Sequence, residues 1–263
     1  MAKVMTVSCA TLRLAILNMI TKAKSSHIGA CFSIVEILWV LYFRTLRINP
    51  TIPQAEDREI CILSKAHAAA ALYATLAYRG FFPIDDLNTY YQDGGNMPGH
   101  LDRHIRGVEA SLGSLGHGLP IAIGLAIGHS SRIFVVLGDG ECNEGSVWEA
   151  AMIAAHLNLN SITVIIDFNR MQSLGSMEEV LNQSNLGERW KSFGWEVYEV
   201  DGHDVEALEK VFSYPSLKPK AVIARTIKGK GVGFMEKDPL AWHYKSPNPG
   251  EYIQAQEEIL KHA

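Results

Sequence analysis

The chain has 263 residues, of which 48% are hydrophobic and 20% are charged, with a formal net charge of −4 at pH 7. This composition is typical of a folded, soluble globular protein, and its mildly acidic balance gives no electrostatic basis for binding nucleic acid or an anionic membrane. No apolar run approaches the roughly 20 residues that span a bilayer, so we expect no membrane contact.

Helical periodicity dominates the first part of the chain. TLRLAILNMITKAK (11–24) is interrupted by Arg13 and Asn18, which favours an amphipathic helix over a signal peptide. SIVEILWVLYFRTL (33–46) repeats apolar residues at helical spacing, and CILSKAHAAAALYATLAYRG (61–80) begins as a short strand and becomes an alanine-rich helix that ends at a glycine. Residues 81–119 are rich in turn signals and predict a long functional loop.

Strands and helices alternate in the second half of the chain. GLPIAIGLAIGH (118–129) predicts a helix of small apolar residues, suited to close packing against a sheet or another subunit. The predicted strands are RIFVVL (132–137), SITVIID (161–167), WEVYEV (195–200) and AVIART (221–226), and the predicted helices are SVWEAAMIAAHL (146–157), ERWKSFG (188–194) and DVEALEKVF (204–212). This alternation predicts an α/β fold in which a parallel sheet is covered by helices on both faces.

Polar residues follow two of these strands where each strand ends. Asp139 lies between Gly138 and Gly140, and Asn169 follows the next strand 30 residues later. Either motif alone is explained by an ordinary turn. Together, at the carboxyl edge of a parallel sheet, they predict a site where oxygen ligands hold Mg²⁺ and the glycines let a diphosphate approach the backbone.

The sequence resembles thiamine-diphosphate enzymes, whose signature is GDG followed after somewhat under thirty residues by Asn. The resemblance extends to the transketolase family over almost the whole chain. The segments that carry it are SSHIGACFS, LSKAHAAAALYATL, MPGHLD, EASLGSLGHGLPIAIG, GDGECNEGSVWEAAMIAAHLNL, DFNRMQSLG and TIKGKGVGFMEKDPLAWHYKSP. The implied fold is the domain that binds the diphosphate of the cofactor.

The resemblance implies a set of residues around the cofactor and its metal. Asp139, the Asn169 side chain and the Met171 carbonyl would hold Mg²⁺. The residues expected along the thiamine diphosphate are Gly113, Ser114, Leu115, Gly138 and Gly140, with Glu141 beside them as a solvated neighbour.

Four histidines fall in motifs of the family. His67 and His243 would approach the diphosphate and thiazolium, and His27 and His100 would face the sugar hydroxyls and manage protons, as histidine does near neutral pH. Glu144 matches an acidic residue that joins a network between paired active sites. His104, His129, His156, His203 and His262 are expected to be structural or exposed, and His117 is as well explained by packing as by cofactor contact.

Three further positions bear on the site. The KGKG segment (228–231) is interpreted as a backbone turn with surface lysines rather than as a phosphate site. Ile28 and Ala66 stand where the family usually has Pro and Gly. Ile28 would enlarge the apolar wall and Ala66 excludes left-handed backbone there, so both put the substrate in question more than the cofactor.

Only 20 residues follow His243, which is too few for the family's later domains. We therefore expect residues 1–263 to form a single diphosphate-binding domain. The pyrimidine-binding domain, its activating glutamate and a C-terminal domain would be supplied by a partner chain in a heterotetramer with two copies of each. The four scattered cysteines, without a CxxC pair, favour a reducing, cytoplasmic location.

Three functional hypotheses follow. The first is the cofactor-binding subunit of a two-chain transketolase that moves a two-carbon ketol unit from a ketose or ketose phosphate to an aldose or a specialised acceptor. The second is a relative that cleaves a 2-oxo acid or transfers an acyl group, as deoxyxylulose-phosphate synthase and similar enzymes do. The third is a catalytically silent binding or regulatory subunit, whose expected mark would be loss of Asp139, Asn169 or the histidines.

Overall fold

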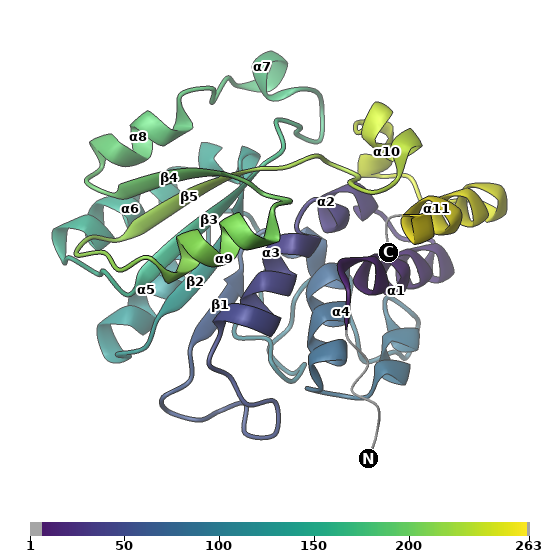
Figure 1. Cartoon of the computed structure of the whole chain (residues 1–263), viewed down its shortest axis with the longest axis horizontal. Coiled ribbons are helices and arrows are strands. Elements are labelled where there is room, and N and C mark those ends of the chain that lie inside the picture. The colour runs from purple at the N-terminus through teal and green to yellow at the C-terminus, as the bar shows by residue number, and fades with distance from the viewer. Residues whose placement is uncertain (1–6, 262–263) are drawn as a thin grey trace.

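The computed structural model describes residues 7–261 and is organised around one five-stranded parallel sheet (Figure 1). The strands are β1 (Ile60–Leu63), β2 (Ile133–Gly138), β3 (Ile162–Phe168), β4 (Glu196–Asp201) and β5 (Lys220–Arg225). Their order across the sheet is β1-β2-β3-β5-β4, and every neighbouring pair is parallel. The predicted parallel α/β fold is therefore confirmed.

Helices cover both faces of the sheet (Figure 1). The helices are α1 (Cys9–Ala23), α2 (Ile28–Phe32), α3 (Val35–Val40), α4 (Ala69–Arg79), α5 (Gly118–Gly128), α6 (Gly145–His156), α7 (Met177–Val180), α8 (Leu186–Ser192), α9 (Val205–Ser213), α10 (Gly233–Lys237) and α11 (Pro249–Lys261). One face is covered by α3 and α9, and the other by α5 and α6. Because both faces are covered, β1, β2 and β3 are almost wholly apolar and buried.

Local sequence signals account for several helix ends. Ser8 caps α1, since its side chain accepts a hydrogen bond from the Thr11 N–H. As predicted, α4 ends at Gly80, whose φ of 96° is left-handed. The single helix predicted for 33–46 is shorter than expected, because α3 passes at Leu41–Thr45 into one π-helical turn.

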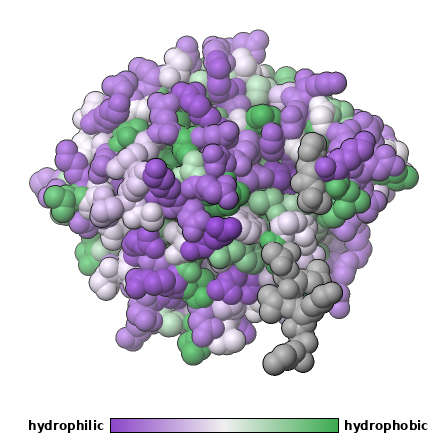
Figure 2. All heavy atoms as spheres, in the orientation of Figure 1, coloured by the Kyte–Doolittle hydropathy of each residue, from purple (hydrophilic) through white to green (hydrophobic). Residues whose placement is uncertain are grey.

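The outer surface of the molecule on the side of α3 and α9 is mainly hydrophilic, with hydrophobic side chains scattered over it (Figure 2). Within residues 7–261, no helix is both long and apolar enough to cross a membrane.

The carboxyl ends of all five strands meet at one edge of the sheet, because the strands are parallel. Beyond them lie Ser64 and Lys65 after β1, Asp139 after β2, Asn169 after β3, Thr226 after β5 and Gly202 after β4. This edge is where the sequence-predicted site residues gather.

Candidate active site

A cavity of about 270 Å³ opens at the carboxyl edge of the sheet. Three of its walls come from strand ends, since Lys65, Asp139 and Asn169 follow β1, β2 and β3. Its other lining residues are His27, Ala30, His67, His100, Gly113, Leu115, Gly138, Gly140, Glu141, Met171, Gln172, Ser173, Lys228, His243 and Tyr244. The fold thus brings together segments that span from residue 27 to residue 244.

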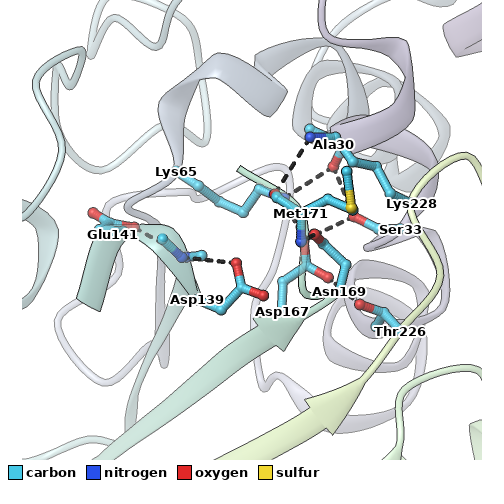
Figure 3. Close-up of polar contacts among 12 residues, drawn as sticks. Ala30, Ser33, Lys65, Asp139, Glu141, Asp167, Asn169, Met171, Thr226 and Lys228 are labelled. Carbon is cyan, nitrogen blue, oxygen red and sulfur yellow. Dashed lines mark hydrogen bonds and ion pairs between the residues drawn. The ribbon is translucent and has the colours of Figure 1, made fainter. Parts of the chain in front are cut away.

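The floor of the cavity is organised by Asp167, the fully buried acid near the end of β3 (Figure 3). One of its carboxylate oxygens accepts hydrogen bonds from Lys65 Nζ at 2.5 Å, Ser33 Oγ at 2.8 Å and Asn169 Nδ2 at 2.9 Å. The other accepts from the Thr226 hydroxyl. Burial alone would raise the pKa of Asp167, but the Lys65 ammonium and these hydrogen bonds lower it below its usual value, so the group is a carboxylate.

Asp139 lies beside Asp167 and, within residues 7–261, forms no ion pair with a side chain. It is 2% exposed, and its two oxygens accept hydrogen bonds from the Gly140 N–H at 2.7 Å and the Arg170 N–H at 2.6 Å. Burial, together with the nearby Asp167 carboxylate, raises the pKa of Asp139 to about 6. A buried carboxylate that is held by backbone donors and makes no direct ion pair is suited to a cation.

The predicted metal ligands are placed together by the fold. Asp139, Asn169 and Met171 all line the cavity, and the Met171 carbonyl faces Lys228 Nζ at 3.4 Å. Among the described residues there is no group of three or more His, Cys, Asp or Glu side chains placed to hold a metal. One carboxylate, one amide and one carbonyl oxygen instead form the partial shell that fits Mg²⁺ when phosphate oxygens and water complete it.

Glu141 is a correction to the sequence-based interpretation. We expected a solvated side chain, but Glu141 is 2% exposed. Its carboxylate accepts hydrogen bonds from the Ser64 hydroxyl, the Gly116 N–H at 2.9 Å and the Gly138 N–H at 3.1 Å. Glu141 therefore ties the glycine-rich segment 113–116 to the ends of β1 and β2, while burial raises its pKa.

The four histidines from separate family motifs form one cluster. The His27 ring centroid lies 5.2 Å from that of His67, 6.4 Å from His100 and 5.1 Å from His243. Burial and nearby positive groups lower the pKa of His27 to about 4 and that of His243 to about 3, and burial holds that of His67 well below its usual value. These three imidazoles are therefore neutral at pH 7.

Two lysines in the cavity were not predicted. Lys65 is 1% exposed and Lys228 is 3% exposed, and the Lys228 ammonium lies 2.8 Å from His243 Nδ1. The KGKG segment does form a turn, with left-handed Gly229 and Gly231, but our placement of Lys228 on the surface was wrong. Burial and the Lys65 charge lower the pKa of Lys228 to about 8.

Other predicted residues lie outside the cavity. Ser114 and Glu144 are exposed and do not line it, and His117 is exposed at the N-cap of α5. Ile28 is fully buried and does not line the cavity either, so the expected enlargement of its wall is wrong. Ala66 begins a 3₁₀ turn, and it is His27 that adopts a left-handed backbone, with φ of 72°.

The remaining histidines mostly fit the structural or exposed role. His104 and His156 are exposed, and His129 contacts the Arg58 carbonyl at 3.0 Å. His203 has a side chain only 11% exposed. His262 lies outside the described residues.

The donor set also fits a diphosphate. Gly140 lines the cavity and is the position where close approach matters, because a Cβ there would come within 3.1 Å of the Gln172 side chain. Lys65 and Lys228 supply cationic charge beside Asp139, and the single metal carboxylate leaves room for an anionic ligand. A cavity of this kind at the carboxyl edge of a parallel sheet defines a domain that binds a diphosphate cofactor with a metal ion.

Comparison with known proteins identifies the family. Residues 4–241 match the family model described as "Transketolase, thiamine diphosphate binding domain". The chain is 43% identical over 243 residues to one subunit of the apulose-4-phosphate transketolase of Actinobacillus succinogenes, and the match covers 89% of this chain and 87% of that protein. It is 38% identical to the 6-deoxy-6-sulfo-D-fructose transketolase subunit SqwG of a Clostridium species, and this match covers 84% of this chain and 83% of that protein.

The solved transketolase of Campylobacter jejuni superposes on 95% of the chain with a TM-score of 0.89 and 30% identity. The match spans 42% of that longer protein. The chain belongs to the transketolase family and carries its thiamine-diphosphate-binding domain. The predicted family, fold and cofactor are confirmed, whereas the roles of the individual site residues stay predictions.

Proposed function

We propose that this chain is the subunit of a two-chain transketolase that holds the diphosphate and Mg²⁺ of thiamine diphosphate, and that the enzyme transfers a two-carbon ketol unit from a ketose phosphate to an aldose or a specialised acceptor. The observation that carries the proposal is the convergence on one cavity of the Asp139–Asn169–Met171 ligand set and the cluster of His27, His67, His100 and His243. When bound, thiamine diphosphate would supply the electron sink for breaking and re-forming the carbon–carbon bond.

The residues beside Asp139 divide the binding task. Asp139, Asn169 and the Met171 carbonyl hold the metal, and Gly138, Gly140, Gly113 and Leu115 leave the backbone open to the diphosphate. Lys65 and Lys228 offset its negative charge, and the binding of an anion would stabilise the charged form of Lys228, whose pKa is lowered by burial and by the Lys65 charge.

We assign His27 and His100, two of the four clustered histidines, to the hydroxyl groups of the sugar donor. They face these hydroxyls and manage the proton that leaves when the carbon–carbon bond breaks, and the unprotonated ring nitrogen of His27 offers an acceptor for that hydroxyl. His67 and His243 lie nearer the metal end, where Lys228 fixes the orientation of the His243 ring. Glu141 acts as a positioning residue for the glycine-rich segment rather than as a cofactor ligand.

A partner chain completes the active site in this proposal. Relatives that the chain nearly matches in length are named as transketolase subunits, which supports a partner that carries the pyrimidine-binding domain and the activating glutamate. We place one diphosphate-binding domain in this chain and the remaining domains in the partner. The exposed Glu144 would join the network between paired sites. The unpaired cysteines Cys9, Cys31, Cys61 and Cys142 support our expectation of a reducing, cytoplasmic location.

The α2β2 stoichiometry has support in an exposed apolar surface on α5 and α6. Its members are Ile121, Ile127, Met152, Ile153 and Leu157, which are 37–66% exposed. Both helices begin directly beyond cavity segments, so a second copy of this chain packed here would bring two sites together. Replacement of Ile127 by Glu is expected to convert the tetramer into a heterodimer in light-scattering measurements, whereas replacement of Leu217, 88% exposed elsewhere, leaves the mass unchanged.

The second enzymatic hypothesis is less well supported. Sugar hydroxyls require the proton acceptors that the four-histidine cluster provides, and the relatives are named for a ketose phosphate and a sulfonated ketose. A silent subunit would have lost site residues, but Asp139, Asn169 and all four histidines are present and brought together. We therefore propose anionic ketoses as the class of sugar donor.

The test begins with a pull-down of this chain from its native lysate and mass spectrometry of what is bound. The complex is then supplied with Mg²⁺, thiamine diphosphate and a panel of ketose phosphates and sulfonated ketoses, and two-carbon transfer to aldehydes is followed by mass spectrometry. Asp139→Ala is expected to abolish metal-dependent cofactor binding, and Glu199→Gln, at an exposed position, serves as the control. Lack of transfer with every sugar, or a chain that associates only with itself, would overturn the proposal.

A further inference from the structure

The loop after β5 carries Lys228 into the cavity and is held by hydrogen bonds to backbone and side-chain groups of neighbouring segments. The Gly229 N–H donates to the Gly29 carbonyl at 3.0 Å and the Gly231 N–H to Glu236 Oε1 at 2.8 Å. The Lys230 carbonyl accepts from Arg13 Nε at 2.8 Å. The Lys228 stem packs closely against Gly29, since a Cβ on Gly29 would lie 3.1 Å from Lys228 Cγ.

His203, just beyond the end of β4, supplies the next contact with this loop. Its Nε2 lies 2.9 Å from the Ile227 N–H, one residue before Lys228. Its Nδ1 lies 3.0 Å from Glu36 Oε2, on α3. Glu36 in turn makes a bidentate ion pair with Arg13, with N···O distances of 2.6 and 2.8 Å. All three side chains are nearly buried, at 8–11% exposed.

The partners of the His203 ring assign its tautomer. A backbone N–H can only donate, so Nε2 must accept the Ile227 bond and carry no proton. Nδ1 then carries the ring proton and donates it to Glu36. Burial would raise the pKa of Glu36, but His203 and Arg13 lower it to about 2, which keeps its carboxylate ionised as the acceptor.

We propose that His203, oriented by Glu36 and Arg13, is a positioning residue that fixes the Ile227–Lys228 backbone and so sets the Lys228 ammonium against His243 and the Met171 carbonyl. The inference rests on the proposed function, since it concerns the diphosphate and metal end of that cavity. It changes our sequence-based assignment of His203 as a merely structural histidine. It also means that every strand of the sheet, including the edge strand β4, contributes to the site through the residues at its carboxyl end.

The test compares two substitutions at His203 in the complex with the partner subunit. His203→Leu removes the acceptor for the Ile227 N–H, and His203→Gln retains one at a similar reach. His129→Leu is the matched control, because His129 also has one hydrogen bond to backbone but lies before β2, at the amino edge of the sheet. Calorimetric titration with Mg²⁺ and thiamine diphosphate gives the cofactor affinity, and steady-state kinetics give kcat and the sugar donor KM.

We expect His203→Leu to weaken cofactor binding about tenfold, the effect of one hydrogen bond to a positioned group. His203→Gln should recover most of this affinity, and the sugar donor KM should stay unchanged at saturating cofactor. Equal cofactor affinity in His203→Leu and His129→Leu, or failure of Gln to rescue a variant that is folded, would overturn the inference. A wild-type complex that binds no thiamine diphosphate would instead overturn the proposed function.

Discussion

Removing the charge of Asp167 should destabilise the chain more than any exposed charge substitution. Asp167→Asn has nearly the same shape, and its amide oxygen can still accept from Ser33 and Lys65, so no cavity is created. What is lost is the counter-charge of Lys65, whose side chain is 2% exposed. Leaving one member of a buried ion pair unpaired typically costs about 3–5 kcal/mol, a large part of the about 5–15 kcal/mol that stabilises a typical domain.

The assay is urea unfolding of the purified chain at pH 7, followed by tryptophan fluorescence. Glu199→Gln is the control, because it breaks an ion pair with Arg225 whose side chains are 52% and 58% exposed, and such pairs contribute about 1 kcal/mol or less. The double variant Lys65→Met/Asp167→Asn removes both charges and should recover part of the loss. If Asp167→Asn unfolds no more easily than Glu199→Gln, the assignment of Asp167 as the buried counter-ion of Lys65 is wrong.

Three further predictions concern the cavity. Asp139→Asn should abolish metal-dependent cofactor binding but change the stability of the chain without ligand by only about 1 kcal/mol or less. Removing a buried acid whose pKa is raised stabilises the fold, whereas the new NH2 group faces one of the two backbone N–H groups from which Asp139 accepts; thermal unfolding with and without Mg²⁺ and cofactor measures both effects. Without ligand, the chain should lose stability as the pH falls from about 6.5 towards 4, because His27 binds a proton in the unfolded state at a higher pH than in the folded state. Urea unfolding at pH 7 and pH 5 should show less of this loss in His27→Gln than in wild type. Tyr244→Ala should change the free energy of unfolding by less than about 0.5 kcal/mol, because the residue is 62% exposed. It should raise the KM for the sugar, because the Tyr244 ring centroid lies 4.5 Å from that of His243 at the cavity wall, and an unchanged KM would show that Tyr244 does not contact the sugar.

The sequence alone was sufficient to predict those site residues that directly follow a buried strand. Asp139 and Asn169 interrupt long apolar runs, and parallel topology alone places such strand ends at one edge. The four histidines could not be grouped in this way, because His27 precedes β1, His67 and His100 lie in the long connection between β1 and β2, and His243 follows β5. Their prediction depended on family motifs, and the structure brings them within 5.1–6.4 Å of one another in the measured ring pairs.

The buried lysines Lys65 and Lys228 depend on tertiary contacts that the sequence pattern does not reveal. A lysine beside glycine is most often on the surface, but Lys228 is buried because Gly29, which has no Cβ, leaves space for its stem beside the cavity. Lys65 is buried because Asp167, 102 residues later in the chain, neutralises it. A signal for Lys65 did exist, since it follows a buried strand in the same way as Asp139.

The carboxylates on strands and loops at this edge divide into two electrostatic classes, which bears on how the site works. Asp167 has a fixed cation and a lowered pKa, so it stabilises the fold whether or not a ligand is bound. Asp139 forms no ion pair within residues 7–261 and has a raised pKa, so its ionised form destabilises the fold. If Asp139 holds the metal as proposed, the fold relies on one carboxylate and metal binding on the other, and binding of the cation relieves the cost of the buried charge in addition to making its own contacts.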